Sequence, residues 1–144
     1  ILNELNINYK IFTNGDPNDY DYAISLCKMY GISNSKLCAR PITPEDLVKL
    51  IASFCCILGS RLHSNIIAYS MCVPSVGVVW DKKVSRFFEK VSACERLVKF
   101  NLDKTVIKKI INDLIQIKYR MKCVEANKQL VRKNFRELIE ALGL

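Results

Sequence analysis

Residues 54–69, FCCILGSRLHSNIIAY, decide the fold of this chain. The stretch opens with a short apolar run rich in cysteine and aromatic side chains, which is typical of a strand that is buried on both faces. A Gly-Ser pair interrupts the run, and apolar residues then recur at the spacing of a helix that packs on a sheet. The stretch therefore predicts a strand, a tight turn and a helix, with Arg61 and His63 in the turn.

The rest of the sequence alternates β-rich runs with helical patterns. Further strands are predicted at residues 7–13, 37–39, 75–80 and 97–100. Helices are predicted to begin at capping residues, namely Asp16 or Asn18, Thr43, Asp81, and Asn101 or Asp103, and a last helix is predicted over residues 119–142. This alternation indicates βαβ units. The predicted fold class is α/β, a Rossmann-like parallel sheet flanked by helices over residues 1–100, with two C-terminal helices in residues 101–144 that pack on or near it.

The composition is that of an ordinary globular chain with an uneven charge. Half of the 144 residues are hydrophobic, and the formal net charge is +8. Residues 96–144 hold 12 Lys and Arg against 5 Asp and Glu, so nearly all of the excess lies at the C-terminal end. Such a basic face can contact a membrane surface or nucleic acid, but a solvated face is its more frequent meaning.

The cysteine pattern points away from disulfides and metals. The chain has seven cysteines, none in a C-x-x-C pair, and one histidine, His63. This pattern indicates neither a disulfide framework nor a zinc site. We therefore expect no metal, no cofactor and a cytoplasmic location, with a weak contact of the basic C-terminal helices with the inner face of the membrane as an option. Because the sequence opens at Ile1 as if already under way, we also expect one domain of a longer protein.

Arg61 and His63 follow the predicted central strand at its carboxyl end. Open parallel sheets bind ligands at this edge, where the N-terminus of the next helix presents N–H groups that lack partners. A guanidinium, an imidazole and a helix N-terminus at one point favour a site for phosphate or carboxylate. The residues alone leave a second interpretation open, in which Arg61 and His63 are an ordinary helix-capping pair in a loop.

Three segments carry a family resemblance: residues 59–64 (GSRLHS), 73–78 (VPSVGV) and 80–84 (WDKKV). They resemble the polysaccharide pyruvyl transferase family, in which an apolar strand leads into an Arg-x-His-(Ser) turn and a segment of the form small-Val-Pro-x-x-Gly-(aromatic)-Asp-x-Lys-Val comes one helix later. The similarity covers residues 37–92 well. This chain has Cys72 where glycine is common and Lys82 where proline is common. The resemblance implies the C-terminal half of a two-domain, glycosyltransferase-B-like (GT-B-like) enzyme, whose N-terminal half would hold much of the acceptor site.

The resemblance also implies a reaction, in which the pyruvyl group of phosphoenolpyruvate becomes a ketal across two hydroxyls of a sugar. Arg61 is then expected to hold the phosphate or carboxylate, because a guanidinium stays charged and binds oxyanions bidentately. His63 is expected either to act as an acid near neutral pH or only to bind phosphate. The Leu62 backbone N–H and the Ser64 hydroxyl are expected to be further donors.

Residues beyond the next predicted strand are expected on the same edge of the sheet. Lys83 would reach the phosphate, and Asp81 would orient Lys83 or contact the sugar; the alternative is an Asp81 helix cap with a solvated Lys83. Trp80 would stack on a sugar ring or, more commonly for the end of a buried strand, belong to the core. Asn14, at the end of the first predicted strand, is expected to serve the turn.

The predicted function is that of a pyruvyl transferase acting on a cell-surface polysaccharide or its precursor, with this chain inactive without its N-terminal half. One alternative is a nucleotide-sugar-dependent glycosyltransferase of the same fold, which needs an acidic residue for the ribose. The other is a non-catalytic anion-binding module whose basic tail contacts lipid or nucleic acid. The expected partners are phosphoenolpyruvate, a sugar or polysaccharide-precursor acceptor and the N-terminal domain of the same protein, and nucleic acid is not expected.

Overall fold

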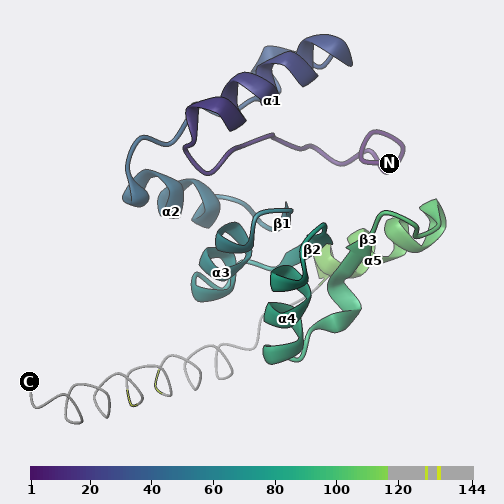
Figure 1. Cartoon of the computed structure of the whole chain (residues 1–144). Coiled ribbons are helices and arrows are strands. Elements are labelled where there is room, and N and C mark those ends of the chain that lie inside the picture. Colours follow the sequence, from purple (N-terminus) through teal and green to yellow (C-terminus); the bar gives the residue numbers. More distant parts are fainter. Residues whose placement is uncertain (117–128, 130–132, 134–144) are drawn as a thin grey trace, which may run out of the picture.

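A parallel three-stranded sheet forms the centre of the structure. The computed structural model describes residues 1–116 together with residues 129 and 133 (Figure 1). The strands lie side by side in chain order, all parallel, as β1 (Ile57–Gly59), β2 (Ser75–Val79) and β3 (Leu97–Lys99). The predicted α/β class with a Rossmann-like parallel sheet is therefore confirmed. The last predicted helix, over residues 119–142, lies outside the described residues.

Helices lie on both faces of the sheet. Each strand is followed by a helix: α3 (Leu62–Ser70), α4 (Lys82–Lys90) and α5 (Lys104–Gln116). Phe88 of α4 packs directly on Gly77 of β2, where an added Cβ would lie 2.5 Å from its ring. The neighbouring Val76 clusters instead with Leu114 of α5. Because successive strand residues point to opposite faces, α4 and α5 cover opposite faces of β2.

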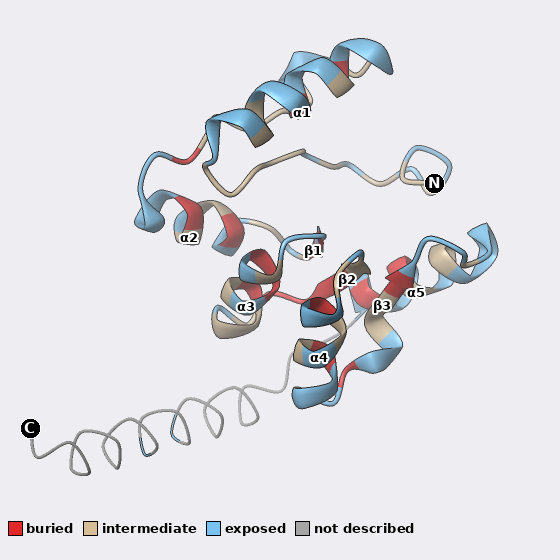
Figure 2. Cartoon of the chain, viewed as in Figure 1, coloured by how far each residue is buried: buried red, intermediate tan, exposed pale blue. Residues whose placement is uncertain are grey.

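One face of β1 remains open, which corrects the prediction of a strand buried on both faces. Leu58 pairs with Val76 and shares its face, yet it is 39% exposed because α5 packs over β2 and β3 (Figure 2). The strand also begins at Ile57, later than predicted. Ser53 is still the C-cap of a helix, and the residues between it and the strand form a bend in which the Phe54 N–H donates to the Ile51 carbonyl at 3.2 Å.

Two helices precede the sheet, and their N-termini are capped as predicted. These are α1 (Pro17–Met29) and α2 (Pro44–Ala52), and short 3-10 turns occur at η1 (Asn34–Lys36) and η2 (Cys94–Arg96). The Asp16 carboxylate accepts from the backbone N–H of Asn18, which caps α1. Thr43 and Asp46 form a reciprocal capping box at α2.

The strands predicted at residues 7–13 and 37–39 are wrong. The two segments share a single parallel bridge between Ile11 and Leu37. It is held by hydrogen bonds from Ile11 N–H to the Lys36 carbonyl at 2.7 Å and from Cys38 N–H to the Ile11 carbonyl at 2.8 Å. Alternating side chains correctly indicated an extended segment, which runs beside α1 in Figure 1. A strand also needs an extended partner of similar length. The partner segment is short here, because the 3-10 turn η1 ends immediately before the bridge.

The N-terminal turn is attached to α5 by charge. The Glu4 carboxylate lies 2.7 Å from the ammonium groups of both Lys104 and Lys108. Hydrogen bonds from these two lysines lower the pKa of Glu4 to about 2.

The helices of the described residues include none with the length and apolar character that a membrane span needs.

Three helices end in the same motif. The residue after the C-cap has a positive φ in α1, α3 and α4, at Gly31 (62°), Cys72 (58°) and Ser92 (53°). In α3 the Val73 N–H then donates to the Ala68 carbonyl at 2.8 Å, as in a Schellman motif. Gly31 thus ends the first helix as predicted, whereas the other two helices use residues that carry a Cβ.

Candidate functional site

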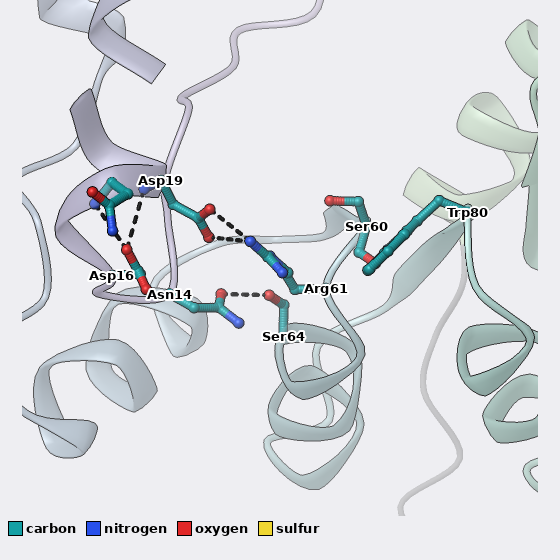
Figure 3. A network of polar contacts seen from close by, with 8 residues as sticks. Asn14, Asp16, Asp19, Ser60, Arg61, Ser64 and Trp80 are labelled. Atoms are coloured by element: carbon teal, nitrogen blue, oxygen red, sulfur yellow. Dashed lines mark hydrogen bonds and ion pairs between the residues drawn. The ribbon is translucent and has the colours of Figure 1, made fainter. Parts of the chain in front are cut away.

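An open groove of about 1530 Å³ lies beside β1. Its walls come from the N-terminal segment, α1 and α5, and the open face of β1 around Leu58 contributes to its lining. Polar side chains gather where the groove meets the β1–α3 turn, namely Asn14, Asp19, Ser60, Arg61 and Ser64 (Figure 3). This turn follows the carboxyl end of a parallel strand, where the sequence predicted the site.

Arg61 stands at the N-cap position of α3 but does not cap it. Its backbone is extended, with φ −80° and ψ 132°, and among the described residues no side chain caps α3. The interpretation of Arg61 as a helix-capping side chain is therefore wrong. The N–H groups of the first helical turn, including that of Leu62, remain available to an anion at this end of α3.

The guanidinium of Arg61 reaches across the groove to α1. Its Nη2 atom lies 2.6 and 2.7 Å from the two carboxylate oxygens of Asp19 (Figure 3). The Arg61 side chain remains about half exposed, at 51%. Asp19 contacts Nη2 alone, so the N–H groups of Nε and Nη1, which point to different sides of the guanidinium, can donate to a second anion. The Asp19 carboxylate thus holds the Arg61 guanidinium in the groove. The same contact shows how a carboxylate can bind at this position.

Asn65 fixes the backbone of the turn that carries Arg61. Its side chain is completely buried, and its Nδ2 donates to the carbonyls of Gly59 at 2.9 Å and Arg61 at 3.0 Å. A Cβ at Gly59 would lie 2.9 Å from the same Nδ2 atom, so the glycine lets the amide approach the strand. Among the described residues the Oδ1 of Asn65 has no hydrogen-bond partner. Asn65 therefore positions the turn and does not contact the groove.

Ser64 holds Asn14 at the edge of the groove. The buried Ser64 hydroxyl donates to Oδ1 of Asn14 at 2.7 Å, which joins α3 to the segment before α1. The hydroxyl predicted to donate to the ligand is thus directed at Asn14 in this structure. Asn14 was expected only to form its own turn, but it also accepts this hydrogen bond and lines the groove.

His63 lies on the first turn of α3, outside the groove. It is exposed, and in the part of the chain that the structure describes the groove is lined by Arg61 but not by His63. Helical geometry explains the difference, because residues two positions apart point in different directions whereas Ser64 and Arg61 share a side. A ligand that contacts both Arg61 and His63 must therefore extend from the groove over the N-terminus of α3.

Asp81 and Lys83 lie at the N-terminus of the neighbouring helix. The Asp81 carboxylate accepts from the Lys83 backbone N–H at 2.9 Å, so Asp81 caps α4. The Lys83 side chain is exposed, and in the described part of the chain neither residue lines the groove. The strand order β1-β2 places the helix starts of α3 and α4 on the same edge of the sheet.

Trp80 is on the surface, which corrects the expectation that it belongs to the core. The indole is 57% exposed because β2 ends one residue earlier. Its Nε1 donates to the Ser60 carbonyl at 2.7 Å, and the Arg61 guanidinium carbon lies 6.0 Å from the ring centroid. Trp80 therefore borders the turn on the side opposite Asp19 (Figure 3).

The cysteines of the groove are poor metal ligands. The sulfur atoms of Cys55 and Cys56 are 4.0 Å apart. Burial, together with the neighbouring Cys55 thiol, raises the pKa of Cys56 to about 11, so its thiol stays protonated at neutral pH. Across the described residues no group of three or more His, Cys, Asp and Glu is placed to hold a metal ion.

Sequence reasoning missed two residues of the site. Asp19 is separated from Arg61 by 42 positions, and no pattern in the sequence shows that α1 folds over the β1–α3 turn. Asn65 did carry a signal, because it is an amide within the otherwise apolar inner side of a helix. Buried amides need hydrogen-bond partners, and the nearest carbonyls are those of the preceding turn.

The fold and the groove define an α/β domain in which Arg61 and an uncapped helix N-terminus lie at the carboxyl edge of the sheet. A family model described as Polysaccharide pyruvyl transferase matches residues 4–82, more than half of the chain. The chain therefore belongs to the polysaccharide pyruvyl transferase family. The match includes Asp19, Arg61 and Trp80, and it ends one residue before Lys83. No curated protein and no solved structure matches the chain.

Proposed function

We propose that this chain is the donor-binding half of a GT-B-like pyruvyl transferase that uses phosphoenolpyruvate. The observation that carries the proposal is the Arg61 guanidinium, which is held in an open groove at the carboxyl edge of the sheet beside an uncapped helix N-terminus. The carboxylate of phosphoenolpyruvate accepts from the N–H of Nε or Nη1 of Arg61, while Asp19 stays on Nη2. The phosphate lies over the start of α3, where the Leu62 N–H and His63 contact it, and Lys83 approaches from α4.

The proposed reaction joins two sugar hydroxyls to C2 of the donor. C3 takes up a proton, the first hydroxyl adds to C2, and the second hydroxyl displaces phosphate from the same carbon. The two hydroxyls release two protons: one balances the proton taken up by C3, and the other leaves with phosphate. His63 supplies the proton or holds the departing phosphate, and Arg61 offsets the negative charge of the donor throughout. The acceptor is a sugar of a cytoplasmic polysaccharide precursor, held in part by an N-terminal domain without which this chain is inactive.

Calorimetric titration of the chain with phosphoenolpyruvate tests the proposal. We expect saturable binding that Arg61→Ala abolishes or weakens at least tenfold, because the variant loses a charge-assisted contact. Arg86→Ala is the matched control, since it removes an exposed arginine of α4. Titration with nucleotide sugars is the second arm. Binding of the nucleotide sugar alone would identify a glycosyltransferase and overturn the proposal, and equal binding by the Arg61→Ala variant would remove Arg61 from the site.

A further inference from the structure

Trp80 presents an apolar surface that the other described residues leave more than half exposed. The side chain is 57% exposed, and its one polar atom, Nε1, is already bonded to the Ser60 carbonyl at 2.7 Å. The hydrogen bond fixes the orientation of the indole, so a partner pays little conformational entropy to meet it. The exposed part of the side chain is aromatic carbon, which favours a ligand with an apolar face.

Polar groups border this apolar surface. The Arg61 guanidinium carbon lies over one face of the ring at 6.0 Å from its centroid, so a ligand stacks on the other face, and Ser60 and Asn14 line the same groove. A ligand that covers the indole therefore needs carbon-bound hydrogens on its face and hydroxyls along its rim. A pyranose ring has this arrangement, because its axial C–H bonds form an apolar face and its hydroxyls lie around the edge.

The groove is also larger than the donor requires. Its volume of about 1530 Å³ exceeds the roughly 300–1,000 Å³ of a pocket for a drug-sized ligand, and phosphoenolpyruvate has only a three-carbon skeleton. Trp80 lines this groove together with Arg61. A donor held by Arg61 therefore does not fill the groove, and Trp80 belongs to the lining that it leaves free.

We propose that Trp80 is the platform on which the acceptor sugar stacks. This inference rests on the proposed function, because it assigns the second substrate of the same reaction to the groove. The indole binds one face of the pyranose, and the ring hydroxyls then extend toward C2 of a donor held by Arg61. Trp80 is a binding residue for the sugar and takes no part in the proton transfers.

Saturation-transfer NMR with methyl glucoside, methyl galactoside and methyl mannoside tests the platform. With phosphoenolpyruvate present, we expect the best-bound glycoside to receive saturation mainly at the C–H protons of one face. Trp80→Ala should weaken its binding about tenfold, whereas Trp80→Phe, which keeps a ring but not the N–H, should retain most of the affinity. Tyr30→Ala is the matched control, because Tyr30, the C-cap residue of α1, is 71% exposed and lies outside the residues that line the groove.

Parallel titrations with phosphoenolpyruvate separate the inference from the proposed function. The platform predicts that Trp80→Ala changes donor affinity less than twofold. If Trp80→Ala leaves glycoside binding intact, Trp80 is not the platform. If Trp80→Ala weakens donor binding as much as sugar binding, the platform is also wrong, and Trp80 only positions Arg61. If the unaltered chain binds no phosphoenolpyruvate, the proposed function fails, and the glycoside comparison still decides whether Trp80 binds sugar.

Discussion

Cys72→Gly is expected to stabilise the chain. Cys72 follows α3 with φ 58°, in the left-handed region, and the Cys72 and Val73 N–H groups donate back to the carbonyls of Tyr69 and Ala68. A left-handed residue with a Cβ costs about 1–2 kcal/mol, and the additional backbone freedom of glycine in the unfolded chain offsets about 0.5–1 kcal/mol of this. The free energy of unfolding should therefore rise by about 0.5–1 kcal/mol, or the melting temperature by about 2–6 °C. Urea unfolding followed by circular dichroism measures the change.

Three matched variants isolate the backbone effect. Cys72→Ala should bring no gain, because alanine keeps the Cβ, and Ser92→Gly should repeat the gain at the same position after α4. Gly31→Ala should cost about 1 kcal/mol, since no atom of the described residues lies within 4 Å of the added Cβ and the positive φ is what opposes it. If Cys72→Gly lowers stability, or if Cys72→Ala stabilises as much, the conformational argument is refuted.

Three further predictions concern packing, charge and the turn. Gly77→Ala places a Cβ 2.5 Å from the Phe88 ring, so urea unfolding should show a loss of about 1–3 kcal/mol. Glu4 has a pKa lowered from 4.5 to about 2, so its contribution to stability is present above pH 4.5 and is lost as the pH falls toward 2. Unfolding of the chain and of Glu4→Gln across this pH range should therefore converge at low pH. Asn65→Leu should weaken phosphoenolpyruvate binding about tenfold in calorimetry, because the turn that carries Arg61 loses two hydrogen bonds.

Each of these predictions has a result that contradicts it. An unchanged stability of Gly77→Ala would show that α4 can move away from the sheet at no cost. A constant difference between Glu4→Gln and the parent chain down to pH 2 would mean that the carboxylate does not tie the N-terminus to α5. Normal donor affinity of Asn65→Leu, with unaltered circular dichroism, would remove the amide from the support of the site.

The sequence predicted the central part of the fold because local and long-range signals agree there. The stretch around the β1–α3 turn combines an apolar run, a Gly-Ser break and a helical period, and the structure has the strand, turn and helix in that order. The N-terminal segment shows the limit of this reasoning. Its alternating pattern indicated a strand, but a strand depends on a partner, and the structure offers only the bridge between Ile11 and Leu37.

The candidate site was predictable in position but not in composition. The carboxyl edge of a parallel strand follows from topology, so Arg61 could be assigned to it from the sequence. The sequence did not show that Asp19 would reach the same guanidinium, because this contact depends on how α1 packs. It also did not show that His63 faces away from the groove, since a helix that begins one residue earlier or later would turn each side chain by about 100°.

A crystal structure of the chain with phosphoenolpyruvate would show whether Arg61 and the start of α3 hold the donor. We expect the donor in the groove, with a carboxylate oxygen about 2.7–2.9 Å from Nε or Nη1 of Arg61 and the phosphate over the N-terminus of α3. Phosphoenolpyruvate bound away from Arg61, or an empty groove in crystals grown at saturating donor concentration, would contradict this expectation.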